Sequence, residues 1–227
     1  MDRAMTQRED LLHARAFLYA YLHRVFASAP DEELFSVMRS GVAEEACRVL
    51  AGCEGAAAHA QAELAGRLTG SPSSYEDDFA RAFVVPGKTR VPLHESVYSC
   101  GEPLLFQKST LEVRHAYRRE GLEATGYPHE PDDHLATELS FMKRMADRLL
   151  EACQDGCEGR AAELADHQVR FLRDHLAPFA ASFADRVEEA LPETSLYVPA
   201  ARLCACVCAD DVAVLGELKD GIVLGIV

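Results

Sequence analysis

Apolar residues recur every three to four positions along most of the chain, which is the period of amphipathic helices. The first such run shares one stripe formed by Leu11, Leu18, Leu22 and Val25. Thr6 and Glu9 form a capping box before it, so a helix should begin there and run to about Ala27. The same spacing predicts a short helix between Pro30 and Gly41, and further helices over residues 42–51, 56–68, 75–83, 109–117, 135–153, 160–176, 178–191 and 196–208.

The helical period is lost between Val84 and Lys108, where Pro and Gly interrupt the chain at Pro86, Gly87, Pro92, Gly101 and Pro103. Irregular segments of this length are uncommon in compact domains and often carry function. Beyond residue 208 we expect a short helix and a loosely packed apolar tail over residues 210–227.

Composition supports the helical interpretation. Ala, Leu, Glu and Arg are plentiful, aromatic residues make up only 7% of the chain, and Trp is absent. A length of 227 residues with 48% apolar residues is enough for one substantial core. The sequence therefore predicts an all-α fold, a multi-helix bundle forming one domain over residues 1–227.

Charge narrows the classes of partner. The chain has 23 basic and 37 acidic residues, and its net charge of −14 repels nucleic acids and anionic membranes. The first residues lack the apolar core of a secretory signal, and no apolar run approaches the length of a membrane span. We therefore expect a cytoplasmic protein that binds no nucleic acid, is not inserted stably in a membrane, and is a monomer or homodimer.

Acidic residues and an imidazole crowd the start of the longest predicted helix, in the segment Glu130-Pro131-Asp132-Asp133-His134 followed by Glu138. Pro131 suits helix entry, and the two aspartates place negative charge at the unpaired amides of a first helical turn. A cap requires neither His134 nor Glu138, which share one helix face and so can hydrogen-bond each other or share a ligand. A metal site that also uses Glu130 is an alternative, although the eight cysteines show no zinc-type pairing.

Three blocks in this order resemble the TorD/DmsD/NarJ family of redox-enzyme maturation chaperones. They are residues 75–83 (YEDDFARAF), residues 92–98 (PLHESVY), and residues 130–135 (EPDDHL) with Glu138 and Leu139. The resemblance implies an all-helical, TorD-like bundle that binds the twin-arginine signal peptide of a molybdenum-cofactor oxidoreductase and assists its maturation before export. Leu93 or His94 stands where relatives often have Trp in the Pro-containing loop, so the identity of the client is not implied.

A peptide with paired arginines followed by an apolar stretch needs a receptor with carboxylates beside an apolar groove. We expect Asp132, Asp133 and Glu138 to supply the carboxylates. The predicted peptide-binding set is completed by Tyr75, Phe79, Phe83, Pro92, Leu93, His94, Ser96, Tyr98, Pro131 and His134. His134 would link the helix start to the loop or to the peptide backbone.

Other interpretations of these residues stay open. Tyr75, Phe79 and Phe83 also have the spacing of core aromatic residues, and the acidic segment also suits a helix cap. Ser96 lacks the glycine-flanked elbow of a hydrolase, and the Pro86-Gly87-Lys88-Thr89 segment lacks the first glycine of a phosphate loop. We therefore expect a binding protein without catalytic residues, cofactor or metal; the competing class is a small helical metal-binding protein or enzyme using residues 130–138.

Overall fold

The computed structural model describes residues 2–51, 55–99, 108–126 and 131–224, and these residues form helices and loops without a named strand. The α-helices are α1 (Asp2–Ala27), α2 (Glu32–Arg39), α3 (Val42–Ala51), α4 (Ala56–Arg67), α5 (Glu76–Phe79), α6 (Ser96–Ser99), α7 (Lys108–Arg119), α8 (Leu135–Gln154), α9 (Glu158–Phe171), α10 (Ala177–Ala190) and α11 (Tyr197–Leu224). Short 3-10 or π segments are η1 (Pro72–Tyr75), η2 (Ala80–Val84) and η3 (Leu172–Leu176). The predicted all-α fold class is confirmed.

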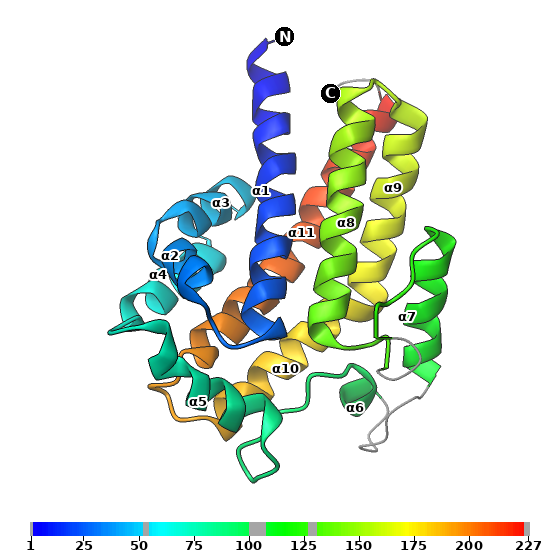
Figure 1. The fold of residues 1–227 in the computed structure, drawn as a ribbon. Coiled ribbons are helices and arrows are strands. Elements are labelled where there is room, and N and C mark those ends of the chain that lie inside the picture. The colour runs from blue at the N-terminus through cyan, green and yellow to red at the C-terminus, as the bar shows by residue number, and fades with distance from the viewer. Residues whose placement is uncertain (1, 52–54, 100–107, 127–130, 225–227) are drawn as a thin grey trace.

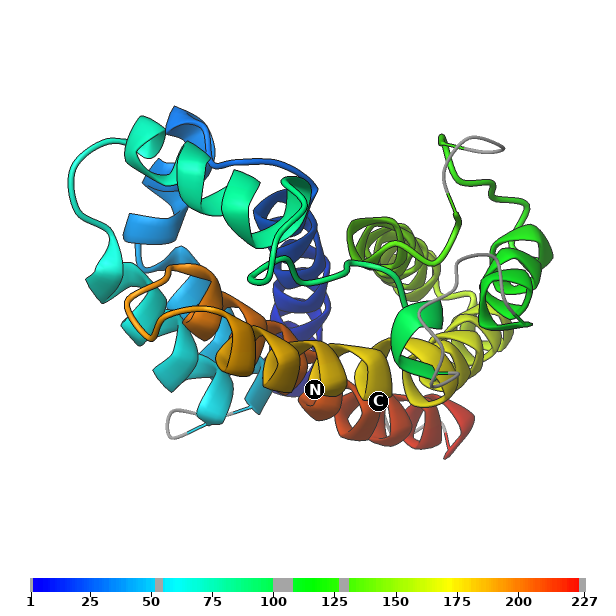
Figure 2. The same ribbon diagram turned by 90° about the horizontal axis from the view of Figure 1, so that it is seen from below.

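The long helix α1 lies along α8 at the centre of the bundle, and α11 crosses behind them (Figure 1). Helices α2 to α5 lie to one side of α1, and α6 to α9 lie to the other (Figure 2). The ends of the described chain, in α1 and α11, both lie at the top of the bundle in Figure 1. None of the described helices combines the length and the low polarity that crossing a bilayer requires.

The core follows the predicted stripes. Leu18, Leu22 and Phe26 of α1 are fully buried, as the three-to-four spacing requires. Phe26 contacts the ring of Phe183 at 5.4 Å between centroids, and Phe83 contacts the ring of Tyr197 at 4.9 Å. These edge-to-face contacts join α1, η2, α10 and α11.

Capping and turn residues mark the start of α2 and the ends of α2 and α7. Asp31 caps α2 by accepting a hydrogen bond from the Leu34 amide at 2.8 Å. Gly41 and Gly121 follow α2 and α7 with φ of +68°, a conformation that costs glycine little.

Four local expectations differ from the structure. Helix α1 begins at Asp2, so Thr6 and Glu9 lie within it instead of before its first residue. Residues 72–84 form a continuous but irregular helical stretch, η1–α5–η2, instead of one regular helix. The predicted break at Pro178 is absent, because the π turn η3 directly precedes α10 and places this proline in its first turn, where an amide hydrogen is not needed. Helix α11 continues without a break at residue 208, and Leu215, Leu218 and Ile222 are buried.

A buried ion pair joins the first and last helices. The Arg15 side chain of α1 and the Asp211 side chain of α11 are both fully buried. Arg15 donates to both Asp211 oxygens and to Oε1 of Gln168 in α9 at 2.8 Å, while the Tyr19 hydroxyl donates to Asp211 at 2.6 Å. Burial opposes the charged form of Arg15, but Asp211 outweighs it and raises the pKa of the guanidinium above its ordinary value.

Candidate functional site

The structure brings the Pro-containing loop and the start of α8 side by side. His94 and His134 form an antiparallel bridge, flanked by hydrogen bonds from the Leu135 amide to the Leu93 carbonyl at 2.8 Å and from the Glu95 amide to the Asp133 carbonyl at 2.9 Å. The two predicted blocks therefore meet at one place, 40 residues apart in the sequence. Glu130 lies outside the described residues.

Asp133 caps the short helix α6 instead of α8. Its Oδ2 accepts a hydrogen bond from the amide of Ser96, the first residue of α6, at 2.8 Å. Both Asp133 and Ser96 are fully buried. The carboxylate that the sequence assigned to the start of α8 thus fixes the end of the loop that carries His94.

Asp132 connects the same loop to α7. Its fully buried carboxylate accepts hydrogen bonds from Nε and Nη2 of Arg114 at 2.9 and 2.7 Å. The Tyr117 hydroxyl donates to the Asp132 carbonyl at 3.1 Å. The predicted role of Asp132 as an α8 cap is therefore wrong, because its side chain is engaged by α7.

His134 is the residue that caps α8. Its Nδ1 accepts a hydrogen bond from the Ala136 amide at 3.2 Å, so in the neutral ring the proton lies on Nε2. Burial, reinforced by His94 and His23, lowers the pKa of His134 to about 4. The imidazole is therefore neutral at physiological pH.

His23 of α1 approaches the same backbone from the other side. Its Nδ1 lies 2.8 Å from the Ala136 carbonyl, which accepts only, so Nδ1 carries a proton. The ring of His94 packs edge-to-face on His134 with 5.1 Å between centroids. Three imidazoles, from α1, from the Pro-containing loop and from the residue that precedes α8, thus lie around the start of α8.

Glu138 points into the protein and is fully buried, and neither of its carboxyl oxygens has a hydrogen-bond partner among the described residues. Burial, together with Glu95 and Asp133, raises its pKa well above the ordinary value. The hydrogen bond to His134 that the spacing allows is not formed. Nδ1 of His175 lies 3.3 Å from both Glu95 oxygens, a contact that the spacing of the sequence does not reveal.

The remaining predicted residues divide between core and surface. Tyr98 is partly exposed, donates to the Pro92 carbonyl at 2.7 Å and packs on Phe179 of α10. The predicted residues that are partly exposed are Phe79, Pro92, His94, Tyr98 and His134. Those that are buried are Tyr75, Phe83, Leu93, Ser96, Pro131, Asp132, Asp133 and Glu138.

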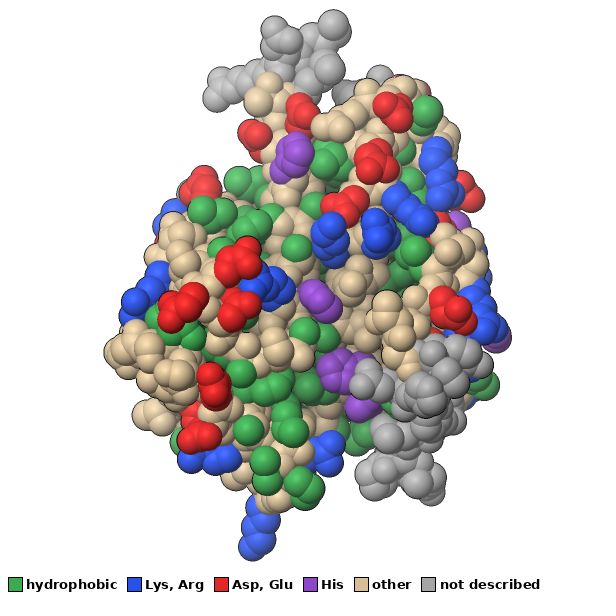
Figure 3. Space-filling view, in the orientation of Figure 1, with side chains coloured by type: hydrophobic (Ala, Val, Ile, Leu, Met, Phe, Trp, Pro, Cys, Tyr) green, Lys and Arg blue, Asp and Glu red, His purple; other side chains and the backbone are tan. Residues whose placement is uncertain are grey.

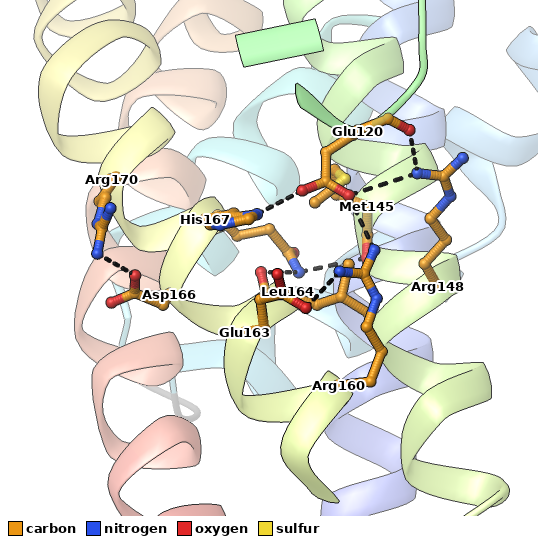
Figure 4. A network of polar contacts seen from close by, with 10 residues as sticks. Glu120, Met145, Arg148, Arg160, Glu163, Leu164, Asp166, His167 and Arg170 are labelled. Atoms are coloured by element: carbon orange, nitrogen blue, oxygen red, sulfur yellow. Dashed lines mark hydrogen bonds and ion pairs between the residues drawn. The ribbon is translucent and has the colours of Figure 1, made fainter. Parts of the chain in front are cut away.

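A second polar cluster holds the end of α7 (Figure 4). Glu120 accepts from Nδ1 of His167, which points at it from α9, and from Nη2 of Arg160 at 3.0 Å. Arg148 of α8 donates to the Glu120 carbonyl at 2.8 Å. Burial opposes ionisation of Glu120, but the hydrogen bonds from His167 and Arg160 outweigh it and lower its pKa below the ordinary value.

Replacing Glu120 with Gln should lower the free energy of unfolding by about 1–3 kcal/mol, because charge-assisted hydrogen bonds are lost at a buried position. A depressed carboxyl pKa stabilises the fold above the unfolded-state value near 4.5 and loses that effect as pH falls through the native value. Urea unfolding of wild type and Glu120→Gln at pH 7 and at acid pH measures the difference in their free energies of unfolding. A difference that fails to shrink in acid would contradict the ion-pair account.

Metal binding finds no support in the part of the chain that the structure describes, where no group of three His, Cys, Asp or Glu side chains could hold an ion. The six described cysteines form no disulfide, and Cys53 and Cys100 lie outside the described residues. Glu130, the third ligand of the alternative site, is also outside them.

Comparison with known proteins gives one family. A family model described as nitrate reductase delta subunit matches residues 51–185. Relatives named "Chaperone protein TorD" include those of Vibrio cholerae serotype O1 (strain ATCC 39315 / El Tor Inaba N16961), 28% identical over 62% of each chain, and Shewanella sp. (strain ANA-3), 29% identical over 64% of this chain and 72% of the relative. This chain thus spans 62% of the length of the Vibrio relative. No solved structure gives a significant match.

Proposed function

The chain belongs to the TorD/NarJ family, since the matched family model covers residues 51–185, and on this premise we propose that it is a redox-enzyme maturation chaperone without catalysis of its own. Its client is a molybdenum-cofactor oxidoreductase, and it binds the client's twin-arginine signal peptide in the cytoplasm before export. The observation that carries the proposal is the junction of residues 92–98 with residues 131–135, two of the blocks that resemble this family.

We assign peptide contact to the His94–His134 surface, defined as Pro92, His94, Tyr98 and His134, which are partly exposed. A neutral imidazole and a tyrosine ring offer flat faces on which a guanidinium stacks, and their edges accept an apolar side chain. Both features suit a peptide with paired arginines and an apolar stretch.

The carboxylates act behind this surface. Asp132 and Asp133 are fully buried and hold the loop against α7 and α6, so they position the His94–His134 surface instead of meeting the peptide directly. Glu138 lies deeper and is fully buried, and burial beside Glu95 and Asp133 raises its pKa and favours the uncharged form. Their predicted contact with the arginines becomes a positioning role in this proposal.

Binding of a synthetic peptide with paired arginines and an apolar tail tests the proposal by isothermal titration calorimetry. We expect a Kd of roughly micromolar, as for a reversible recognition step, and about tenfold weaker binding after His94→Ala. Asp133→Ala should also weaken binding while circular dichroism keeps its helical signal. His13→Ala, which removes an exposed imidazole from the far half of α1, is the matched control and should leave binding unchanged.

The proposal is contradicted if this peptide shows no saturable binding. It is also contradicted if a peptide whose two arginines are replaced with Gln binds equally well. Loss of the helical signal in Asp133→Ala would assign that residue to folding alone. In that case the His94→Ala result still decides whether the His94–His134 surface meets the peptide.

A further inference from the structure

A pocket of about 530 Å³ opens between α1, α8 and the loop after α7. Its cationic side chains come from two helices, Arg24 from α1 and Lys143 and Arg144 from α8, and His23 lies beside them. Phe141 and Leu122 contribute apolar surface. We call this the α1–α8 pocket, and its size is within the range of ligand sites.

The lining is unusual for a chain of net charge −14, because Glu123 is the one acidic side chain among the described residues that line the pocket. Arg24 and Lys143 are paired with Asp31 and Asp147 outside it. Arg144 is exposed and forms no ion pair with any described residue. Figure 3 shows basic side chains (blue) gathered over α8, near an imidazole (purple) at the centre of this face.

Hydroxyl groups add hydrogen-bond donors to the wall of the pocket. Thr125, Thr137 and Ser140 add hydroxyl groups. His23 donates a hydrogen bond from Nδ1 to the Ala136 carbonyl, so Nε2 of the neutral ring is an acceptor and is not counted among these donors. Donors and cations beside apolar surface are suited to carboxylate groups carried on a chain that also has apolar atoms.

The pocket adjoins the proposed peptide surface, and the two share contacts with the backbone of one residue, Ala136. His23 lines the pocket and binds the Ala136 carbonyl, while His134 of the His94–His134 surface binds the Ala136 amide. The pocket and the His94–His134 surface are therefore adjacent, so that one polypeptide can contact both. The positive charge of the pocket lining disfavours binding of the paired arginines inside the pocket.

We propose that the α1–α8 pocket binds an acidic segment of the client polypeptide next to its arginine-containing stretch, with Arg144 and Lys143 as the carboxylate-binding residues. This inference rests on the proposed function. It also gives the direction in which the client polypeptide lies: its basic part contacts the His94–His134 surface and its acidic part contacts the α1–α8 pocket. The spread of the cations over two helices favours carboxylates along a chain over a single phosphate, which is usually bound by converging backbone amides.

Calorimetry with five peptides tests the inference: the twin-arginine peptide alone, and the same peptide extended at its N-terminus or at its C-terminus by four Glu or by four Gln. At low salt one Glu version should bind wild type roughly three- to tenfold more tightly than its Gln counterpart, as one or two partly exposed ion pairs allow. The Glu-over-Gln ratio should fall to about one in Arg144→Gln/Lys143→Gln.

Arg119→Gln is the matched control, because it removes an exposed arginine that lines a different pocket, and it should keep the ratio. A ratio of one in wild type for both ends, or a ratio unaffected by the double substitution, would overturn the inference. Saturable binding of inorganic phosphate alone below millimolar concentration would also overturn it, by showing a small-anion site. If no version of the peptide binds at all, the proposed function fails first.

Discussion

Replacing Arg15 with Met is expected to lower the free energy of unfolding by about 3–5 kcal/mol, because it leaves Asp211 as a charged group without its partner in the core. That loss is a large share of the roughly 5–15 kcal/mol by which domains are stable. Asp211→Leu should cost a similar amount by stranding Arg15. Urea unfolding at pH 7, followed by circular dichroism, measures both.

The double variant Arg15→Met/Asp211→Leu is expected to be more stable than the sum of the single losses predicts, because no buried charge is left unpaired. Arg24→Met is the control on the same helix, since Arg24 pairs with Asp31 at the surface and should cost no more than about 1 kcal/mol. Strictly additive losses at Arg15 and Asp211 would show that the pair is not coupled.

The helices could be predicted from the sequence because their apolar stripes are long and regular. The run from Leu135 to Leu149, for example, becomes the buried face of α8. Irregular segments were harder. The four-residue helix α6 has no period to detect, and its first amide is capped by Asp133, a residue distant in the sequence.

Two of the segments assigned to the candidate site lie side by side, but their polar contacts differ from those that the spacing suggested. Spacing suggested that His134 and Glu138 share a face, yet His134 turns back to cap α8 while Glu138 points into the core. Local spacing cannot reveal that Arg114 and His175 supply the partners of Asp132 and Glu95, because these pairs form only when α7 and η3 pack against the loop.

The buried acids also explain how a loop rich in Pro can present a fixed surface. A loop without helical hydrogen bonds needs other partners for its backbone, and the amides of Glu95 and Ser96 find them in Asp133. His94 is thereby set between two anchored neighbours. Recognition of a partner costs less when the receptor surface is already ordered, so under the proposed function the anchoring of this loop contributes to peptide binding without contact.

Glu138→Gln is expected to become more stable relative to wild type as pH rises. The raised pKa means that native Glu138 holds a proton which the unfolded chain releases above pH 4.5, so the stability of wild type falls with rising pH between 4.5 and the native value. One proton limits that slope to about 1.4 kcal/mol per pH unit. Gln has nearly the same shape and cannot ionise, so it lacks the slope.

Urea unfolding of wild type and Glu138→Gln from pH 5 to pH 9 measures the difference directly. Glu120→Gln is the informative control, because the pKa of Glu120 is lowered, so its own carboxyl group adds no such slope above pH 5. Burial, together with the neighbouring Glu95 and Asp133 carboxyl groups, raises the pKa of Glu138, so a flat difference over this range would contradict the raised pKa. A rising difference instead assigns the proton to Glu138. One of the three neighbouring carboxyl groups of Glu95, Asp133 and Glu138 is then neutral, which reduces the repulsion among acids that share one core.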